Sequence, residues 1–313
     1  MKAALLMNDL PIIDSVEQPI GGMERELMSI GVILAERYDT TLYLNTTRPW
    51  AYNGLEFRPF NEKIMPVDIA VNCDVPSKKR IVYWFHDRGT IPVDIDLVIT
   101  DTKRGVEKYK QDGYHTVLFY PPTSIGGENV LRDPQKILFV GAINVGKRVD
   151  LAIEAVNLLP EYELHVIGME RGKEAEWCGR YVKDYQRYCK AISKNNIIWR
   201  GPLPYSKVIK EMQTAQMIII PYCSDEEYNT DVALEAISNG CVPLIAEGLT
   251  DYFGENEAVF LTNQRQLNPE IIADTINSLS EYELKARRER CYLKAKEIYN
   301  YCTTEMKDII CEI

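Results

Sequence analysis

Residues 136–158 have the sequence KILFVGAINVGKRVDLAIEAVNL. The apolar run Lys136–Gly141 predicts a buried strand, and apolar residues recurring every three or four positions over Val149–Leu158 predict a helix. The loop between them contains a glycine followed by two adjacent cations. A strand, a loop and a helix in this order form the repeating unit of α/β proteins with parallel sheets.

The same alternation extends from this unit in both directions. Upstream, apolar and amphipathic patterns predict strands at 2–7, 41–45, 68–73, 81–85, 97–100 and 117–120, and helices at about 21–37 and 101–111. Downstream, they predict strands at 163–167, 196–199, 217–221 and 242–246, and helices at about 172–193, 205–214 and 232–239. Helical patterns dominate after residue 268. We therefore expect two α/β halves, each with a Rossmann-like alternation.

A linker candidate separates these halves. Residues 121–134, PPTSIGGENVLRDP, hold three prolines and two glycines, which interrupt helices and strands. We predict an N-terminal domain over 1–123 and a C-terminal domain over 124–296. The expected fold is α/β, with two Rossmann-like domains facing a central cleft, because ligands of open α/β sheets bind outside the carboxyl ends of the strands.

Composition excludes several classes of protein. The 313 residues carry a net charge of −10, which argues against nucleic-acid binding and against a broad contact with anionic membranes. The eight cysteines form no CxxC pair, so we expect reduced thiols and a cytoplasmic location. The first apolar run is too short for a signal peptide, and no segment approaches about 18 consecutive apolar residues. Membrane contact is expected to be peripheral at most, with Lys78-Lys79-Arg80 as its local candidate.

Two glycines after the first predicted strand form a candidate phosphate site. Gly21 and Gly22 open the next helix, where the backbone can approach a ligand closely. The N–H groups and the positive dipole end of a helix start favour a phosphate. A flexible start of a helix, without a ligand, is the alternative interpretation.

The loop 141–148, GAINVGKR, is a second candidate phosphate site. It follows the P-loop pattern GxxxxGK[ST] except at its last position, where Arg148 replaces the hydroxyl residue that would ligate Mg²⁺. This difference argues against a magnesium-dependent nucleotide hydrolase. Lys147 and Arg148 beside a helix start still suit a diphosphate, and a solvated pair of cations is the alternative.

Two glutamates and one histidine complete the set of candidates. Glu227 is expected in the loop after the strand at 217–221, and Glu235 in the helix that follows. A carboxylate can accept hydrogen bonds from two vicinal sugar hydroxyls, so the pair could bracket one ligand. His86 is expected where the strand at 81–85 meets the cleft, which favours a role in the site.

Other chemistry-bearing residues have structural interpretations. His165 falls within a buried strand pattern and His115 beside a turn. Asp94-Ile95-Asp96 matches a D-x-D metal-binding motif, but it precedes a strand and is therefore expected at the wrong edge of a parallel sheet for a ligand site. We expect it to form the turn into that strand.

Together these stretches resemble the GT-B glycosyltransferases of family 4, the group 1 type. The resembling segments are ILFVGAINVGKRVDLAIEAV (137–156), EEYNTDVALEAISNGCVPLIA (226–246), residues 21–45, WFHDRG (84–89) and LVITDTKRGVEKYKQDG (97–113). The resemblance implies a transferase that moves a hexose from a UDP- or GDP-sugar to a hydroxyl acceptor in carbohydrate biosynthesis. It implies a retaining mechanism without metal or cofactor, and last helices, about 297–313, that return to the N-terminal, acceptor-side domain.

The resemblance also implies roles for individual residues. Lys147 and Arg148 would hold the donor diphosphate, Glu235 the nucleotide ribose, and Glu227 the hydroxyls of the donor sugar. His86 would contact that sugar near the reacting carbon, so His86 and Glu227 are the catalytic candidates. The complete donor-binding set is Gly21, Gly22, Gly141, Lys147, Arg148, Arg200, Asn229, Thr230, Asp231 and Glu235. No side chain is assigned as general base.

Two departures from the family pattern keep other functions open. Ala142 stands where the family usually has arginine, and Arg148 or Arg200 is the candidate to compensate. Glu227-Tyr-Asn-Thr230 stands where Glu-Gly-Phe-Gly is usual. A non-catalytic nucleotide- or carbohydrate-binding relative is therefore one alternative. A P-loop-like nucleotide hydrolase, which requires Mg²⁺, is the other.

Overall fold

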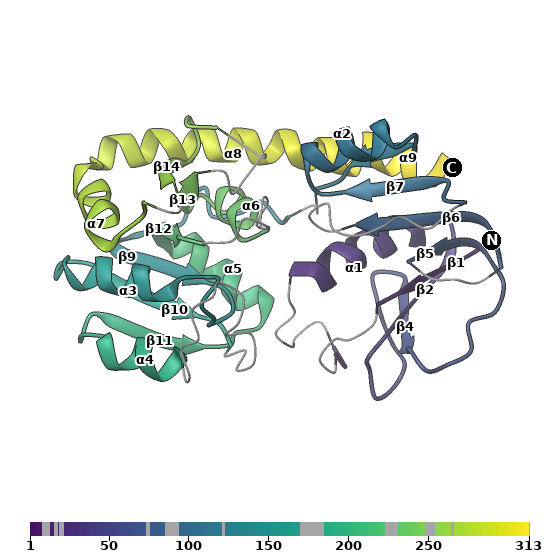
Figure 1. The fold of residues 1–313 in the computed structure, drawn as a ribbon, viewed down its shortest axis with the longest axis horizontal. Coiled ribbons are helices and arrows are strands. Elements are labelled where there is room, and N and C mark those ends of the chain that lie inside the picture. The colour runs from purple at the N-terminus through teal and green to yellow at the C-terminus, as the bar shows by residue number, and fades with distance from the viewer. Residues whose placement is uncertain are drawn as a thin grey trace. The chain divides into compact units, whose positions relative to one another are not determined.

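The computed structural model divides into two compact units (Figure 1). It describes residues 1–7, 13–15, 18, 22–72, 76–84, 94–120, 123–169, 185–222, 231–247, 254–263 and 266–312. Unit 1 comprises Met1–Pro122 with Ile298–Ile313, and unit 2 comprises Thr123–Glu297. The domain boundaries expected from the sequence lie one residue away from these limits.

Unit 1 contains an eight-stranded sheet with the order β3-β4-β2-β1-β5-β6-β7-β8. Its strands are β1 (Lys2–Leu6), β2 (Asp39–Leu44), β3 (Trp50–Tyr52), β4 (Leu55–Pro59), β5 (Val67–Val71), β6 (Ser77–Trp84), β7 (Leu97–Thr100) and β8 (Thr116–Leu118). Its helices are α1 (Gly22–Ala35), α2 (Lys103–Gln111), the end of α8 (Glu281–Thr303) and α9 (Glu305–Glu312). Every strand pair is parallel except β3–β4.

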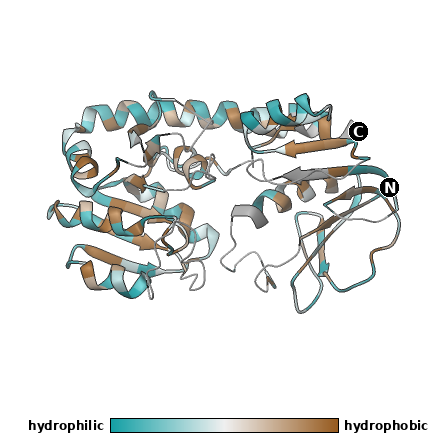
Figure 2. Ribbon diagram, viewed as in Figure 1, coloured by the Kyte–Doolittle hydropathy of each residue, from teal (hydrophilic) through white to brown (hydrophobic). Residues whose placement is uncertain are grey.

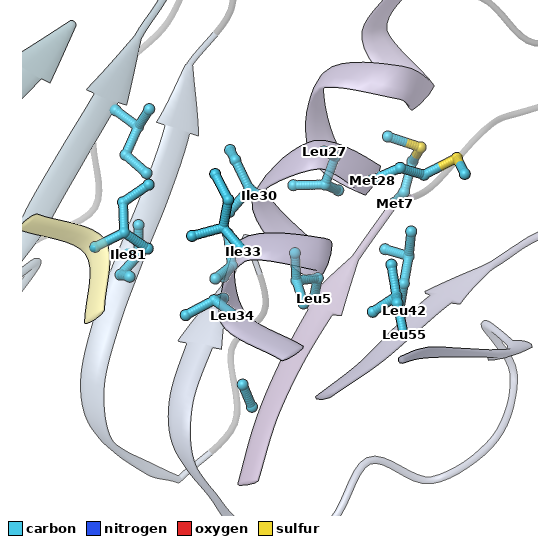
Figure 3. Packing of buried hydrophobic residues seen from close by; sticks show 14 of the residues in the cluster. Leu5, Met7, Leu27, Met28, Ile30, Ile33, Leu34, Leu42, Leu55 and Ile81 are labelled. Atoms are coloured by element: carbon cyan, nitrogen blue, oxygen red, sulfur yellow. The ribbon is translucent and has the colours of Figure 1, made fainter. Parts of the chain in front are cut away.

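The core of unit 1 forms where α1 packs on the central strands. Leu5 on β1 pairs in register with Leu42 on β2 and Val71 on β5. Leu27, Ile30 and Leu34 on α1 are buried with them (Figure 3). The spacing of three and four along α1 places these side chains on one face, as the sequence pattern predicted.

The β3–β4 hairpin was not predicted from the sequence. Its turn is formed by Asn53 and Gly54, which both have positive φ (49° and 80°). Asn-Gly is a strong signal for a two-residue hairpin turn, because both positions need that conformation. Trp50 and Phe57 then stack across the two strands, with ring centroids 3.7 Å apart.

The D-x-D segment has the structural role expected of it. Asp94 has a positive φ of 65°, and Asp96 Oδ2 accepts a hydrogen bond from the backbone N–H of Arg80 (2.8 Å) at the start of β7. Lys79 pairs with Asp96 (3.5 Å) and Lys78 with Asp68 (2.6 Å). The basic run at 78–80 is therefore largely matched by neighbouring carboxylates, which weakens it as a membrane contact.

Unit 2 contains a six-stranded parallel sheet with the order β11-β10-β9-β12-β13-β14. Its strands are β9 (Asp133–Val140), β10 (Glu163–Ile167), β11 (Ile197–Gly201), β12 (Ala215–Ile220), β13 (Val242–Glu247) and β14 (Val259–Asn263). Its helices are α3 (Val149–Asn157), α4 (Tyr185–Ile192), α5 (Tyr205–Thr214), α6 (Asp231–Ser238), α7 (Pro269–Ser278) and most of α8. The expected helix at 172–193 is observed as α4, and its earlier part lies outside the described residues.

The central strands of unit 2 are buried on both faces. All six residues of β12 are buried, and the strands are predominantly hydrophobic along their length (Figure 2). This is the pattern of a parallel sheet covered by helices on both sides. Strand order reverses between β9 and β12, and the carboxyl edge at such a reversal is where open α/β sheets bind ligands.

The side chain of Arg132 fixes the segment that follows residue 122 through several hydrogen bonds. Arg132 donates to the backbone oxygens of Met212 (3.1 Å), Ala215 (2.8 Å) and Asn239 (2.7 Å), and to the hydroxyl of Tyr292 on α8 (2.9 Å). One guanidinium thus joins the ends of α5 and α6 to α8. The described residues include no helix long and apolar enough to cross a membrane.

Candidate functional site

The loop from β9 to α3 lies at the strand-order reversal of unit 2. Its first half continues the hydrogen bonding between β9 and β10. Gly141 N–H donates to Ile167 O (3.0 Å) at the end of β10, and Ile143 N–H donates to Met169 O (2.9 Å) just beyond it. The side chains of Ile143 and Val145 are buried. The loop is therefore held in one conformation by β10 and by the core of unit 2.

Two glycines allow this close approach. A Cβ atom built on Gly168 would lie 2.9 Å from the carbonyl carbon of Gly141 and closer still to its oxygen. A Cβ on Gly141 would lie 3.0 Å from the hydroxyl of Tyr222. Gly141 is therefore packed between the end of β10 and Tyr222, the second residue after β12. Its expected donor-binding role is compatible with this position, which leaves its backbone close to the edge of the sheet.

Lys147 lies over the ring of Tyr222. Its Nζ is 3.9 Å from the ring centroid, which is within the range of a cation–π interaction. Asn144 Oδ1 accepts a hydrogen bond from the backbone N–H of Lys147 (2.9 Å). The loop and the end of β12 together place the ammonium at the carboxyl edge of the sheet.

Tyr222 was not identified from the sequence. It is only 1% exposed, its hydroxyl donates to Val140 O (3.0 Å), and its ring meets that of Phe139 edge to face. The available signal was its position directly after the strand at 217–221. Gly168 and Asn144 were not identified from the sequence either. Their roles, like that of Tyr222, depend on contacts between residues that are separate along the chain.

Arg148 is oriented differently from Lys147. It precedes α3 in the left-handed conformation (φ 50°), and its Nε and Nη2 donate to the carboxylate of Asp150 at 3.0 and 3.1 Å. Tyr185 donates a further hydrogen bond to Asp150 (2.6 Å). Burial, together with the nearby Asp150, raises the pKa of Tyr185, so the phenol remains a neutral donor. The charge of Arg148 is thus matched by a carboxylate two residues away.

Arg200 lies two strands from β9. Its Nη2 donates to Glu211 Oε1 (3.0 Å), while Lys136 Nζ lies 2.7 Å from Glu211 Oε2. His165 Nδ1 is 3.7 Å from the same oxygen. Desolvation by burial acts to raise the pKa of Glu211, but the hydrogen bond from Lys136 and the charges of Lys136, Arg200 and His165 outweigh it and lower that pKa. Arg200 therefore contributes to a charged cluster on α5, β9, β10 and β11.

Glu235 is a buried carboxylate at the centre of α6. Glu235 is 2% exposed to solvent. A carboxylate is buried only where charged or hydrogen-bonding groups offset the loss of water, so it is a functional candidate. The C-terminal end of α6 is fixed, because Asn239 Nδ2 donates to Glu235 O (2.9 Å) and Thr123 bonds to Ser238 through their hydroxyls.

The remaining predicted site residues are only partly described. Asp231 is the first residue of α6, and Gly22 is the first residue of α1. The candidates that lie outside the described residues are Gly21, His86, Glu227, Asn229 and Thr230. Across the described ranges, no group of three or more His, Cys, Asp or Glu side chains is arranged to hold a metal ion.

The cysteines in the described part of the chain are not poised for chemistry. Those recorded as free and buried are Cys189, Cys241, Cys291 and Cys302. Burial raises the pKa of Cys189, Cys241 and Cys302 to about 12. A thiol is nucleophilic as its thiolate, so these residues act as small apolar side chains.

Comparison with known proteins identifies a family and a fold. The family model described as Glycosyl transferases group 1 matches residues 123–298. Among solved structures, sucrose-phosphate synthase from Thermosynechococcus elongatus is 11% identical with a TM-score of 0.71, over 100% of this chain and 99% of that one. Trehalose-6-phosphate synthase OtsA is 9% identical with a TM-score of 0.71, over 100% and 99%. HepE from Anabaena, solved in complex with UDP, is 13% identical with a TM-score of 0.68, over the whole of both chains. No curated protein matches by sequence.

Proposed function

The chain belongs to the group 1 glycosyltransferases, enzymes that transfer sugars from nucleotide-sugar donors, and on this premise we propose its reaction in more detail. The proposed donor is a UDP- or GDP-hexose, and the proposed acceptor is a hydroxyl group of a carbohydrate or similar molecule. The configuration at the anomeric carbon is retained, and neither metal nor cofactor takes part. The fold, two Rossmann-like domains, is that of the GT-B glycosyltransferases.

The position of Lys147 is the observation that carries this proposal. Its ammonium lies at the carboxyl edge of the sheet, between the ends of β9 and β12, where the strand order reverses. Glu235 lies on α6, the helix reached after β12. A cation and a buried carboxylate on adjacent connections suit the two ends of a nucleoside diphosphate, namely its diphosphate and its ribose hydroxyls.

The chemistry requires stabilisation of a leaving diphosphate. When the bond between the anomeric carbon and the phosphate oxygen breaks, negative charge develops on the diphosphate. An ammonium fixed beside that oxygen stabilises the developing charge without reorganising at the moment of reaction. We assign this role to Lys147, and we assign binding of the ribose hydroxyls to Glu235. Binding of the sugar by Glu227, the backbone at 229–231 and His86 remains part of the proposal.

The solved relative HepE supports a nucleoside diphosphate as the ligand, because its structure contains UDP. Arg148 and Arg200 are weaker candidates for the diphosphate than Lys147. Each has a carboxylate partner in unit 2, Asp150 and Glu211 respectively, which would have to be exchanged for phosphate. The free, buried cysteines support the reducing cytoplasm as the compartment that we propose.

The loop geometry argues against the P-loop alternative. In a P-loop the backbone N–H groups point to the phosphates. Here the N–H of Lys147 donates to Asn144 Oδ1, and the N–H of Arg148 donates to Val145 O (3.3 Å). These donors are already used within the loop. The non-catalytic alternative, by contrast, predicts nucleotide binding without turnover, and an activity assay separates it from the proposed function.

A direct test is an assay of donor turnover in the presence of EDTA. UDP- and GDP-hexoses are incubated with the protein and a panel of hydroxyl acceptors, and nucleotide release is measured together with the NMR coupling of the product's anomeric proton. We expect release of one nucleotide class and a product with the anomeric configuration of the donor. Inverted product, or turnover that requires Mg²⁺, would contradict the proposed mechanism.

A further inference from the structure

Tyr222 joins three parts of the candidate site. It is the second residue after the end of β12 and is 1% exposed. Its hydroxyl donates to the carbonyl of Val140, the last residue of β9, and its ring lies beneath the ammonium of Lys147 at 3.9 Å. The hydroxyl also faces Gly141, where a Cβ would approach it to 3.0 Å. One side chain therefore fixes both the exit of β9 and the cation that follows it.

The contact between Lys147 and Tyr222 differs in kind from that between Arg148 and Asp150. A carboxylate cancels the charge of a cation and competes with an incoming phosphate for the same donors. An aromatic face attracts an ammonium through its quadrupole and adds no formal negative charge. Lysine is a flexible point charge with about 2 kcal/mol of rotamer entropy, so a fixed ring limits its positions before the ligand arrives.

We propose that Tyr222 is a positioning residue for the donor diphosphate. Its ring holds the Lys147 ammonium, and its hydroxyl fixes that ring by donating to the Val140 carbonyl. This inference rests on the proposed function of the same site. Tyr222 acts through Lys147 and does not itself need to touch the ligand. Its effect on diphosphate binding must therefore disappear when Lys147 is absent, which a purely structural role would not require.

The test is a double-mutant cycle on the full chain. Binding of UDP and of GDP is first measured calorimetrically in EDTA with the unmodified protein, and the tighter ligand is used thereafter. Affinities are then measured for Tyr222→Leu, Tyr222→Phe, Lys147→Met and the double variant Tyr222→Leu/Lys147→Met. Tyr292→Leu serves as a control, because Tyr292, which lies on α8, is also hydrogen-bonded within unit 2 but has Arg132 as its partner.

We expect Tyr222→Leu to weaken binding of the diphosphate by roughly 3- to 30-fold, the range of a cation–π contact from half-exposed to desolvated. In the Lys147→Met background the same substitution should weaken it by less than about twofold, because the coupled interaction is already lost. Tyr222→Phe keeps the ring but loses the hydrogen bond to Val140, so it should weaken binding by less than Tyr222→Leu does. Tyr292→Leu should remain within about twofold of the unmodified protein.

Each outcome has one interpretation. Equal losses in both backgrounds, or no loss at all, would overturn the role of Tyr222. If Tyr222→Leu does not fold, a trifluorinated phenylalanine at position 222 replaces it, because fluorination weakens the ring quadrupole and leaves the ring shape almost unchanged. Equal affinities for Phe and its trifluorinated form would then overturn the proposal. If the unmodified protein binds neither UDP nor GDP, the proposed function fails, and the inference fails with it.

Discussion

Replacing Gly168 by alanine is expected to displace the loop that carries Lys147. The new Cβ would lie 2.9 Å from the carbonyl carbon of Gly141 and closer still to its oxygen, and real Cβ atoms essentially never approach other atoms within 3.0 Å. Both partners are backbone, so no side chain can rotate to relieve the overlap. The end of β10 and the start of the loop must separate.

The magnitude follows from the hydrogen bonds in this region. Separation strains or breaks the bonds from Gly141 N–H to Ile167 O and from Ile143 N–H to Met169 O, each of which contributes about 1 kcal/mol. The φ of +159° at Gly168 adds about 1–3 kcal/mol of backbone strain for alanine. We therefore expect the free energy of unfolding to fall by about 3–5 kcal/mol, and UDP binding through Lys147 to weaken.

The assay is urea unfolding followed by circular dichroism, with Gly201→Ala as the matched control. Gly201 also has a positive φ (68°), but a Cβ there would meet no atom within 4 Å. The control should lose only about 1–2 kcal/mol, the cost of a left-handed alanine. With a slope of about 2 kcal/mol per molar urea, the two midpoints should differ by roughly 1 M. If Gly168→Ala lowers the midpoint no more than Gly201→Ala does, the steric reasoning is refuted.

Three further predictions concern the charged residues. Arg132→Met should lower the free energy of unfolding by about 3 kcal/mol or more, because it leaves several backbone oxygens of unit 2 without their donor. The control Arg37→Met removes an exposed ion pair and should cost less than about 1 kcal/mol in the same urea titration. The pKa of Glu211 is lowered below its ordinary 4.5, so its stabilising effect is complete above pH 4.5 and is lost as the pH falls through the lowered value. The difference in the free energy of unfolding between the unmodified protein and Glu211→Gln should therefore shrink between pH 6 and pH 3. A difference that stays constant over this range would contradict the assignment. Asp150→Asn should lower the free energy of unfolding by about 1–3 kcal/mol, because Arg148 loses a two-point charged contact, and an unchanged thermal midpoint would exclude that contribution.

Much of the fold could be predicted from local patterns. The strands at 136–141, 217–221 and 242–246 could be predicted because buried parallel strands are nearly continuous apolar runs. The hairpin at 50–59 was missed, although Asn53-Gly54 between aromatic residues is a hairpin signal. A βαβ alternation predicts parallel strands alone, so it does not indicate this antiparallel addition at the sheet edge.

The candidate site could be predicted only in part, because the sequence gives positions along the chain and not contacts between loops. Lys147 and Arg148 are adjacent and looked equivalent, yet one lies over an aromatic ring and the other binds Asp150. The left-handed conformation of Arg148 separates the two side chains. Tyr222 contributes through residues about 75 to 82 positions away, Lys147 and Val140, which no local pattern indicates.

The most direct test of the central claim is a thermal-shift measurement with UDP and GDP in EDTA, on the unmodified protein, Glu235→Gln and Lys147→Met, with the exposed Glu289→Gln as control. A ligand at about 100 times its dissociation constant adds roughly 2.7 kcal/mol to the stability of the protein. We predict a clear increase in Tm with one nucleotide for the unmodified protein and the control, and a much smaller one for the two site variants. An equal increase in all four proteins, or an increase that appears only with Mg²⁺, would contradict a metal-independent nucleoside-diphosphate site in which Lys147 binds the diphosphate and Glu235 the ribose.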